Sequence, residues 1–246
     1  MNNKTSDFLD PFIKIDVTNK IILKEYDVKI YDFSKYFKNL LKIYTDDLTL
    51  LHEVLPNELN PKKVVTVNDD QKLPIYNLLY KIDDAYNLKI KKKQSGFLNM
   101  YDDFVSNLAK NFFNEELIYQ ARPTLRVNFP NNKAVGGWHR DRDYNHPVEE
   151  INIWVPITKS INTNAIWIES QFDKNDFKPI NTNYGQFIIF DSGLKHGNKL
   201  NIENKCRISF DFRIIPKSQY KEKFKKSSND TKMKFKIGDY YKLTRI

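Results

Sequence analysis

The spacing of apolar residues changes once along this 246-residue chain, close to Glu116, and that change limits the possible folds. Before Glu116, apolar side chains recur every three or four residues, as on one face of a helix. After it they alternate with polar ones, as in residues 124–129, which is the period of a half-buried strand. We therefore expect helices at residues 33–54, 73–90 and 97–113, followed by strands.

The second half of the chain has several short segments that predict strands, separated by turn residues such as Asn, Gly and Pro. Regularly spaced short strands favour a sandwich or barrel of the jelly-roll type. Weaker alternation at residues 21–31 adds one or two strands, and residues 233–246 add a terminal one. The expected core strands are residues 124–129, 151–155, 165–168, 187–190 and 207–212.

The length of the chain suits one substantial hydrophobic core. We expect a single domain over residues 1–246, with a mostly helical part at 1–115, a strand-rich core at 116–215, and a basic loop and strand at 216–246. The chain has no apolar run of about 18 residues that would span a membrane, and it does not begin like a secretory signal. Its one cysteine, Cys206, cannot form an internal disulfide, so we expect a cytoplasmic, reducing environment.

The net charge of +9 comes mostly from lysine and is interpreted as solvated surface, although a basic protein can also bind nucleic acid. Arginine is more informative, because only seven are present and six of them lie between residues 122 and 213. An arginine fork binds a carboxylate or phosphate through two parallel hydrogen bonds, which lysine cannot do. All three tryptophans lie in the same stretch, where we expect the chemistry.

A candidate metal-binding motif begins at His139, which with Arg140 and Asp141 has the form His-x-Asp. Residues two apart on an extended segment point to the same side, so one imidazole and one carboxylate can reach one ion. His196, 57 positions later, is the candidate second imidazole. Two histidines and a carboxylate are the ligands of non-haem Fe(II) oxygenases. Asp143 is a competing carboxylate, which we rank below Asp141 because of this geometry.

A candidate anion site follows 11 positions after His196, at Arg207. Arg207, Ser209, Asp211 and Arg213 share one face of the expected strand, and apolar residues share the other. The polar face is either solvated, as on many half-buried strands, or it faces the inside of a barrel. A guanidinium inside a barrel is costly unless it meets an anion, so the second case would make Arg207 a carboxylate site.

The order His-x-Asp, a distant His and then Arg-x-Ser resembles the Fe(II)/2-oxoglutarate-dependent oxygenases. Residues 97–215 resemble a branch of that family found in streptomycin-type aminoglycoside and sporadic surface-carbohydrate gene clusters. This branch is distantly related to phytanoyl-CoA dioxygenase and ectoine hydroxylase. The resemblance implies an α+β, mainly β fold: a double-stranded β-helix (jelly roll, cupin-like) with the N-terminal helices packed on one sheet.

The resemblance also implies the roles of individual residues. His139, Asp141 and His196 would be the catalytic iron ligands, and 2-oxoglutarate and O2 would be cosubstrates. Arg207 would pair with the distal carboxylate of 2-oxoglutarate, supported by Ser209. Further cosubstrate contacts would come from Arg126, Asn128 and Trp154. Each of these three residues can equally be a core residue.

The substrate is expected to be a polar small molecule such as a sugar, an aminocyclitol or a nucleotide sugar. The protein is expected to be a monomer or homodimer that does not associate with membranes. Because Asp141 keeps the carboxylate that related halogenases lack, hydroxylation, desaturation or a similar oxidation is expected. Candidate substrate contacts are Arg140, Asp143, His146 and Asn152.

Three alternatives stay open. A cupin-type metalloenzyme that does not use 2-oxoglutarate would keep the triad but would not need Arg207. A nucleic-acid-modifying oxygenase or basic binding protein would use the positive charge and the lysine-rich residues 217–236. A jelly roll without catalytic activity would serve as an interaction module, which the intact triad argues against.

Overall fold

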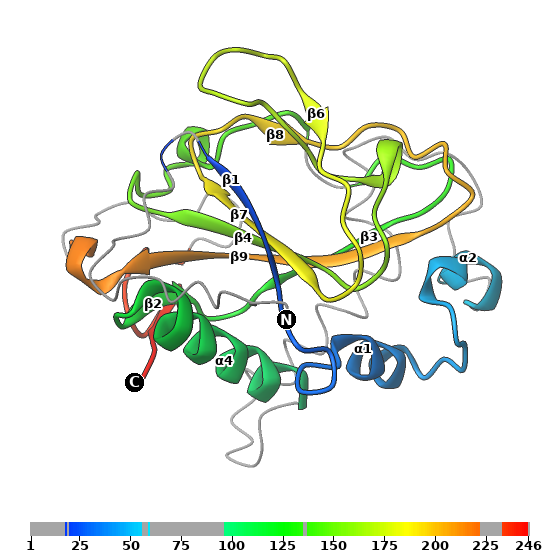
Figure 1. Ribbon diagram of the computed structural model, residues 1–246, viewed down its shortest axis with the longest axis horizontal. Coiled ribbons are helices and arrows are strands. Elements are labelled where there is room, and N and C mark those ends of the chain that lie inside the picture. Colours follow the sequence, from blue (N-terminus) through cyan, green and yellow to red (C-terminus); the bar gives the residue numbers. More distant parts are fainter. Residues whose placement is uncertain are drawn as a thin grey trace, which may run out of the picture.

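The computed structural model describes residues 18, 20–55, 59, 96–134, 137–221 and 233–245 (Figure 1). The helix predicted at residues 73–90 and most of the basic loop lie outside this part of the chain. The helices predicted at 33–54 and 97–113 are confirmed. They are α1 (Phe33–Leu41), a 3-10 turn (Leu48–Leu50) that leads into α2 (Leu51–Val54), and α4 (Gly96–Leu108), which continues as a π-helical turn (Ala109–Phe113).

A large antiparallel sheet forms the centre of the described structure, in the order β1-β7-β4-β9-β2-β10, with β3 also paired to β9. Its longest strand, β9 (Arg207–Pro216), pairs with three others and crosses the whole molecule (Figure 1). The other strands are β1 (Ile21–Glu25), β2 (Leu117–Gln120), β3 (Thr124–Asn128), β4 (Ile151–Pro156), β7 (Gln186–Asp191) and β10 (Tyr241–Leu243).

A second, smaller antiparallel sheet has the order β6-β5-β8. Its strands are only two residues long, too short to show a period in the sequence. The strands predicted at 124–129, 151–155, 187–190 and 207–212 are confirmed, and the one at 165–168 is shorter than expected. The sequence did not predict β2, β6 and β8. Every residue of β2 is buried, so no alternation appears in it. The small sheet consists of β5 (Trp167–Ile168), β6 (Lys178–Pro179) and β8 (His196–Gly197).

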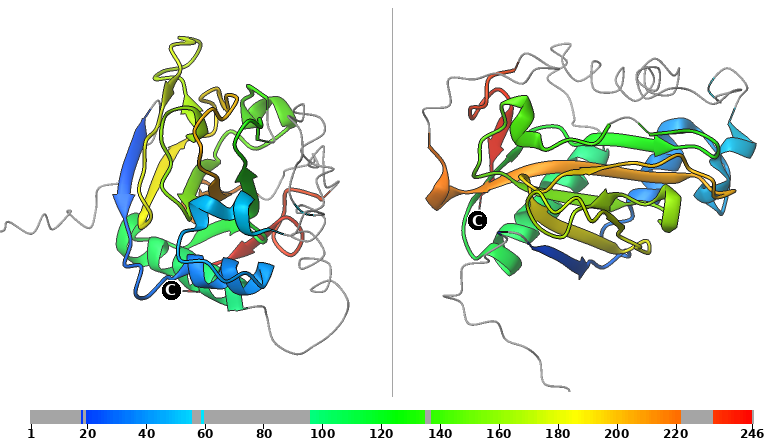
Figure 2. Two further views of the ribbon diagram at one scale, coloured as in Figure 1. Left: turned by 90° about the vertical axis from the view of Figure 1, so that its right-hand side faces the viewer. Right: turned by 90° about the horizontal axis from the view of Figure 1, so that it is seen from above.

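The helices cover one face of the large sheet, as the two further views show (Figure 2). The apolar side chains of β9 face them: the Phe210 ring lies 4.8 Å from that of Phe33, centroid to centroid, and the Phe212 ring 5.0 Å from that of Tyr101. Phe104 joins the same cluster of edge-to-face rings, which bury large apolar areas. The described helices include none long and apolar enough to span a membrane.

Replacing Phe210 by alanine is expected to lower the free energy of unfolding by about 3–5 kcal/mol, because the ring is fully buried among aromatic neighbours that cannot collapse onto the cavity. Leu23→Ala on the edge strand β1, where the side chain is 46% exposed, is the control and should cost less than about 1 kcal/mol. Urea unfolding of both variants measures the difference. Equal losses would contradict this view of the core.

The opposite face of β9 is polar and nevertheless buried, which decides between the two possibilities left open by the sequence. Arg207 is 1% exposed, Ser209 is fully buried, and Arg213 is 7% exposed. A solvated polar face is therefore wrong for this strand. The polar face of the large sheet and the small sheet enclose the pocket described below.

Cys206 directly precedes β9 and is packed rather than reactive. Its side chain is buried, and its Sγ lies 3.2 Å from Nδ1 of His52. Burial raises the pKa of the Cys206 thiol to about 12, so the thiolate is scarce at neutral pH. Both residues contribute to the packing of the α2 region against β9.

Candidate metal centre

The imidazoles of His139 and His196 are brought together by backbone pairing. The two residues form an antiparallel bridge, in which His139 N–H donates to the His196 carbonyl at 3.0 Å and His196 N–H donates back at 2.9 Å. Directly paired residues on antiparallel segments place their side chains on the same face. The two ring centroids lie 4.5 Å apart, although 57 positions separate the residues in sequence.

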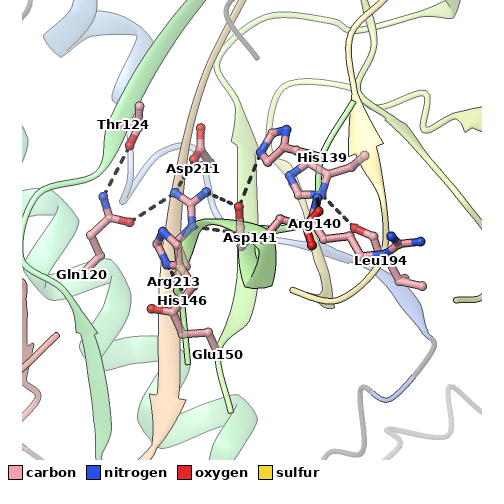
Figure 3. Close-up of polar contacts among 12 residues, drawn as sticks. Gln120, Thr124, His139, Arg140, Asp141, His146, Glu150, Leu194, Asp211 and Arg213 are labelled. Atoms are coloured by element: carbon pink, nitrogen blue, oxygen red, sulfur yellow. Dashed lines mark hydrogen bonds and ion pairs between the residues drawn. The ribbon is translucent and has the colours of Figure 1, made fainter. Parts of the chain in front are cut away.

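Asp141 joins the two histidines because the chain is still extended at Arg140, with φ −109° and ψ 142°. His139 and Asp141 therefore point to the same side, and Oδ1 of Asp141 lies 3.5 Å from Nε2 of His139 (Figure 3). Each of the three residues offers one ligand atom, and these atoms all lie within 4.8 Å of one another. The other candidate carboxylate, Asp143, is exposed and accepts the Arg140 N–H at 3.2 Å.

Both histidines are oriented by hydrogen bonds from the ring nitrogen that faces away from the site. Nδ1 of His139 lies 2.6 Å from the Gly137 carbonyl oxygen, and Nδ1 of His196 lies 2.9 Å from that of Leu194. A carbonyl only accepts, so each Nδ1 carries the proton and each Nε2 keeps its lone pair for an ion. Burial and the neighbouring His139 lower the pKa of His196 to about 4, so this ring is neutral at neutral pH.

The Asp141 carboxylate is held by an arginine that sequence reasoning did not assign to the site. Arg213 Nε donates to Oδ2 and Nη2 donates to Oδ1, each at 3.1 Å (Figure 3). Burial alone would raise the pKa of Asp141, but the Arg213 guanidinium outweighs it and holds the pKa well below its usual range. The signal in the sequence was the two-residue alternation that places Arg213 on the same face as Arg207.

The ion pair continues along the large sheet as a chain of alternating charges. Asp211 Oδ2 accepts from Nη1 of Arg213 at 2.8 Å, and its Oδ1 accepts from Nε of Arg126 at 2.8 Å. Arg126 lies on β3 beside β9, opposite Ser209 in the pairing. The predicted cosubstrate residue Arg126 is thus in an ion pair on the wall of the pocket.

Arg207 lies at another part of the same wall, in hydrogen bonds to neutral oxygens. Nη1 donates to Ser209 Oγ at 2.9 Å, and Nη2 donates to Asn198 Oδ1 at 2.6 Å. Nε donates to the Asn164 carbonyl at 3.0 Å. The guanidinium carbon lies 5.7 Å from the centroid of the Trp154 ring. The predicted neighbours Ser209 and Trp154 are therefore next to Arg207, and Asn198 is an addition that the sequence did not indicate.

Asn128 is unusual among the buried polar residues of this region. It lies opposite Arg207 in the pairing of β3 with β9 and is fully buried. Neither its side-chain nitrogen nor its side-chain oxygen has a hydrogen-bond partner among the described residues. Buried polar groups are rarely left unpaired, so the Asn128 amide keeps unused hydrogen-bonding capacity beside Arg207, but it is not among the residues that line the pocket.

The pocket between the two sheets opens to solvent, and together with its open mouth it has a volume of about 440 Å³. Two of the three candidate metal ligands line it, together with Asn152, whose buried side-chain oxygen is also without a partner in the described structure. Polar and apolar side chains both line it, as in many small-molecule sites. The lining residues are Arg126, His139, Asn152, Trp154, Ile166, Phe190, His196, Gly197, Asn198, Arg207, Asp211 and Arg213.

Three candidate substrate residues do not line this pocket. Arg140 points to the opposite side from its neighbours and pairs with Asp173 at 2.6 Å. Asp143 caps the 3-10 turn Asp141–Tyr144 that follows the motif. His146 Nδ1 lies 2.6 Å from a carboxylate oxygen of Glu150, and its ring packs against Phe235. The turn after Asp141 ends the two-residue alternation, so the sequence could not place these side chains.

The donor set fits a divalent transition metal. Two imidazoles and one carboxylate suit iron, manganese, cobalt or nickel, and they leave coordination positions for exchangeable ligands. The outer hydrogen bonds, which both Nδ1–H groups donate and the Asp141 carboxylate accepts, are those expected around a metal centre.

Comparison with known proteins found one curated relative of note. The chain is 39% identical over 123 residues to the streptomycin biosynthesis protein StrG of Streptomyces griseus, covering 50% of this chain and 58% of StrG. The chain thus matches less than two thirds of the length of that relative. No protein-family model matches the chain.

Solved structures with a similar course of the backbone are distant from this chain in sequence. The non-heme α-ketoglutarate-dependent carbocyclase SnoK from nogalamycin biosynthesis covers 92% of both chains at 11% identity and a TM-score of 0.47. The non-heme monooxygenase ThoJ in its nickel complex covers 63% of this chain and 72% of its own at 15% identity and a TM-score of 0.44. CytC3 with Fe(II) and α-ketoglutarate covers 64% and 72% at 15% identity and a TM-score of 0.41.

Proposed function

We propose that this protein is an Fe(II)- and 2-oxoglutarate-dependent oxygenase built on a double-stranded β-helix. The observation that carries the proposal is the convergence of ligand atoms from His139, Asp141 and His196, within 4.8 Å of one another, beside a pocket that contains a buried arginine. Three protein ligands on one face leave three positions for exchangeable ligands. When bound, the iron would supply the redox chemistry that couples decarboxylation of the cosubstrate to oxidation of the substrate.

Arg207 is the anchor that this proposal assigns to the distal carboxylate of 2-oxoglutarate. Its guanidinium contacts Asn198, which is two residues beyond the metal-ligand candidate His196. His196, Asn198 and Arg207 line the same pocket, so one dicarboxylic acid bound there would meet both the candidate ligands and the guanidinium. The cosubstrate would then reach the metal with its 2-oxo acid end and the Arg207 fork with the other.

Buried polar groups beside Arg207 support the same assignment. The Ser209 hydroxyl already accepts from Arg207, and the unpaired Asn128 amide lies on the adjacent strand. A ligand carboxylate there would offer acceptors to the Asn128 amide nitrogen and would meet the positive charge of Arg207. The residues present therefore fit a dicarboxylic cosubstrate.

The substrate assigned by this proposal is a polar small molecule such as a sugar, an aminocyclitol or a nucleotide sugar. The wall nearest the candidate ligands offers the Asn152 amide and the Arg126–Asp211 pair, which suit hydroxyl and amine groups. Trp154 and Phe190 offer apolar surface on the same face of the sheet, where they pair with Asp211 and Asn152. The role of StrG in streptomycin biosynthesis supports a small-molecule substrate. The carboxylate of Asp141 supports hydroxylation or desaturation.

The test is an anaerobic titration of the purified protein with Fe(II), followed by 2-oxoglutarate. We expect one iron per chain and a charge-transfer absorption when the 2-oxo acid chelates it. Aerobic incubation with a panel of sugars, aminocyclitols and nucleotide sugars should then give succinate in excess of the substrate-free control for at least one compound class. A wild-type protein that binds no stoichiometric iron would refute the proposal.

A further inference from the structure

The Asp141 carboxylate is held from outside the ligand set by a fork that occupies both of its oxygens. Arg213 donates to Oδ1 and to Oδ2 at 3.1 Å, and its side chain is only 9% exposed. Among the described residues, the other ion-pair neighbour of this carboxylate is His139, 3.5 Å from Oδ1. The plane of the carboxylate is therefore set by Arg213, and Oδ1 is the oxygen on the imidazole side.

We propose that Arg213 is the positioning residue of the metal centre, which fixes Asp141 for ligation through Oδ1 alone. This inference rests on the metal site of the proposed function. A carboxylate without such a fork rotates about its terminal torsion, which has a broad energy profile. It can then turn away from the metal or chelate it through both oxygens and use a position that a cosubstrate needs.

A guanidinium near a metal ion also repels it. Arg213 therefore favours metal binding by orienting Asp141 and opposes it by its positive charge. Here the charge is balanced, because Asp211 pairs with Arg213 and also with Arg126. The chain Arg126, Asp211, Arg213 and Asp141 contains two positive and two negative groups. These four groups together carry no net charge, so Arg213 orients the ligand without leaving this chain of charges net positive.

The same chain of charges allows orientation to be tested separately from charge. The double variant Asp211→Asn with Arg213→Met removes one negative and one positive group and releases Asp141. The matched control, Asp211→Asn with Arg126→Met, removes the same charges but leaves the Arg213 fork on Asp141. Both variants are compared with the wild type by titration with Mn(II) alone, in which free Mn(II) is measured by electron paramagnetic resonance.

We expect the Arg213 double variant to bind Mn(II) about 10–100-fold more weakly than the wild type, the range typical for loss of an outer partner of a metal ligand. The Arg126 double variant should lose less than about tenfold. Equal affinities of the two double variants would overturn the proposal. A wild-type chain that does not bind Mn(II) would instead overturn the metal site itself, and the inference with it.

Arg213→Lys provides a second, milder test, because it keeps a buried positive charge and so threatens folding less. A lysine ammonium is a single point charge and cannot hold both carboxylate oxygens in one plane. We expect a Mn(II) affinity between those of the wild type and the Arg213 double variant, with an unchanged circular dichroism spectrum. Wild-type affinity in Arg213→Lys would overturn the positioning role, even if neither double variant folds.

Discussion

Alanine at His139 is expected to abolish stoichiometric iron binding and, with it, succinate formation. The loss in metal affinity should exceed about 100-fold, because removal of an outer partner alone costs about 10–100-fold and His139 is itself one of the three ligand candidates found in the described part of the chain. The imidazole lies at the edge of the pocket with 18% of its side chain exposed, so the fold should tolerate its removal. Anaerobic Fe(II) titration measures the first effect and succinate analysis the second.

The matched control is His52→Ala, which removes the same side chain from a different part of the molecule. His52 contacts Cys206 and is not among the pocket residues. Iron stoichiometry and succinate formation should be those of the wild type. Full iron binding by the His139→Ala protein would remove the basis of the oxygenase proposal, because the metal would then bind somewhere else.

Replacing Arg207 by glutamine is expected to separate cosubstrate binding from metal binding. The affinity of the iron-loaded protein for 2-oxoglutarate should fall by at least about 30-fold, which corresponds to the loss of about 2 kcal/mol from one buried charge pair. Mn(II) affinity should stay near that of the wild type, since Arg207 hydrogen-bonds Asn164, Asn198 and Ser209 rather than a ligand candidate.

A second ligand shows whether Arg207 acts on the distal carboxylate. 2-Oxobutyrate has the same 2-oxo acid group but no second carboxylate, so its affinity should change little in Arg207→Gln. If both acids lose affinity equally, Arg207 supports the pocket structurally and does not pair with the cosubstrate. Succinate formation that is unaffected by Arg207→Ala would favour a metalloenzyme that does not use 2-oxoglutarate in this way.

Long elements were predictable from the sequence because their apolar residues repeat with a clear period. The helix α4 and the strand β9 contain enough residues for a period of about four or of two to appear. The strand β8 has two residues, and its position depends on pairing with β5 and on the bridge to His139. The candidate ligand His196 lies on β8. Its place beside His139 could therefore be inferred from the sequence only by spacing and resemblance.

The surroundings of the candidate metal ligands were less predictable than the ligands themselves. The two-residue rule placed His139 and Asp141 on one side because the chain is extended through Arg140, and it failed beyond Asp141, where a 3-10 turn begins. Arg140 and His146 therefore pair with acidic side chains away from the pocket. No local pattern indicates such a turn.

Local chemistry, read from the order of residues, was sufficient to name an imidazole–carboxylate–imidazole set and to expect an arginine near it. It could not decide whether the polar face of β9 meets water or the small sheet, because both arrangements have the same alternation. Only the packing of two sheets buries Arg207 and Arg213 and brings Arg213 onto Asp141, 72 positions away. Strand periodicity is a property of neighbouring residues, whereas burial and ion pairing depend on which distant segments come to lie against them.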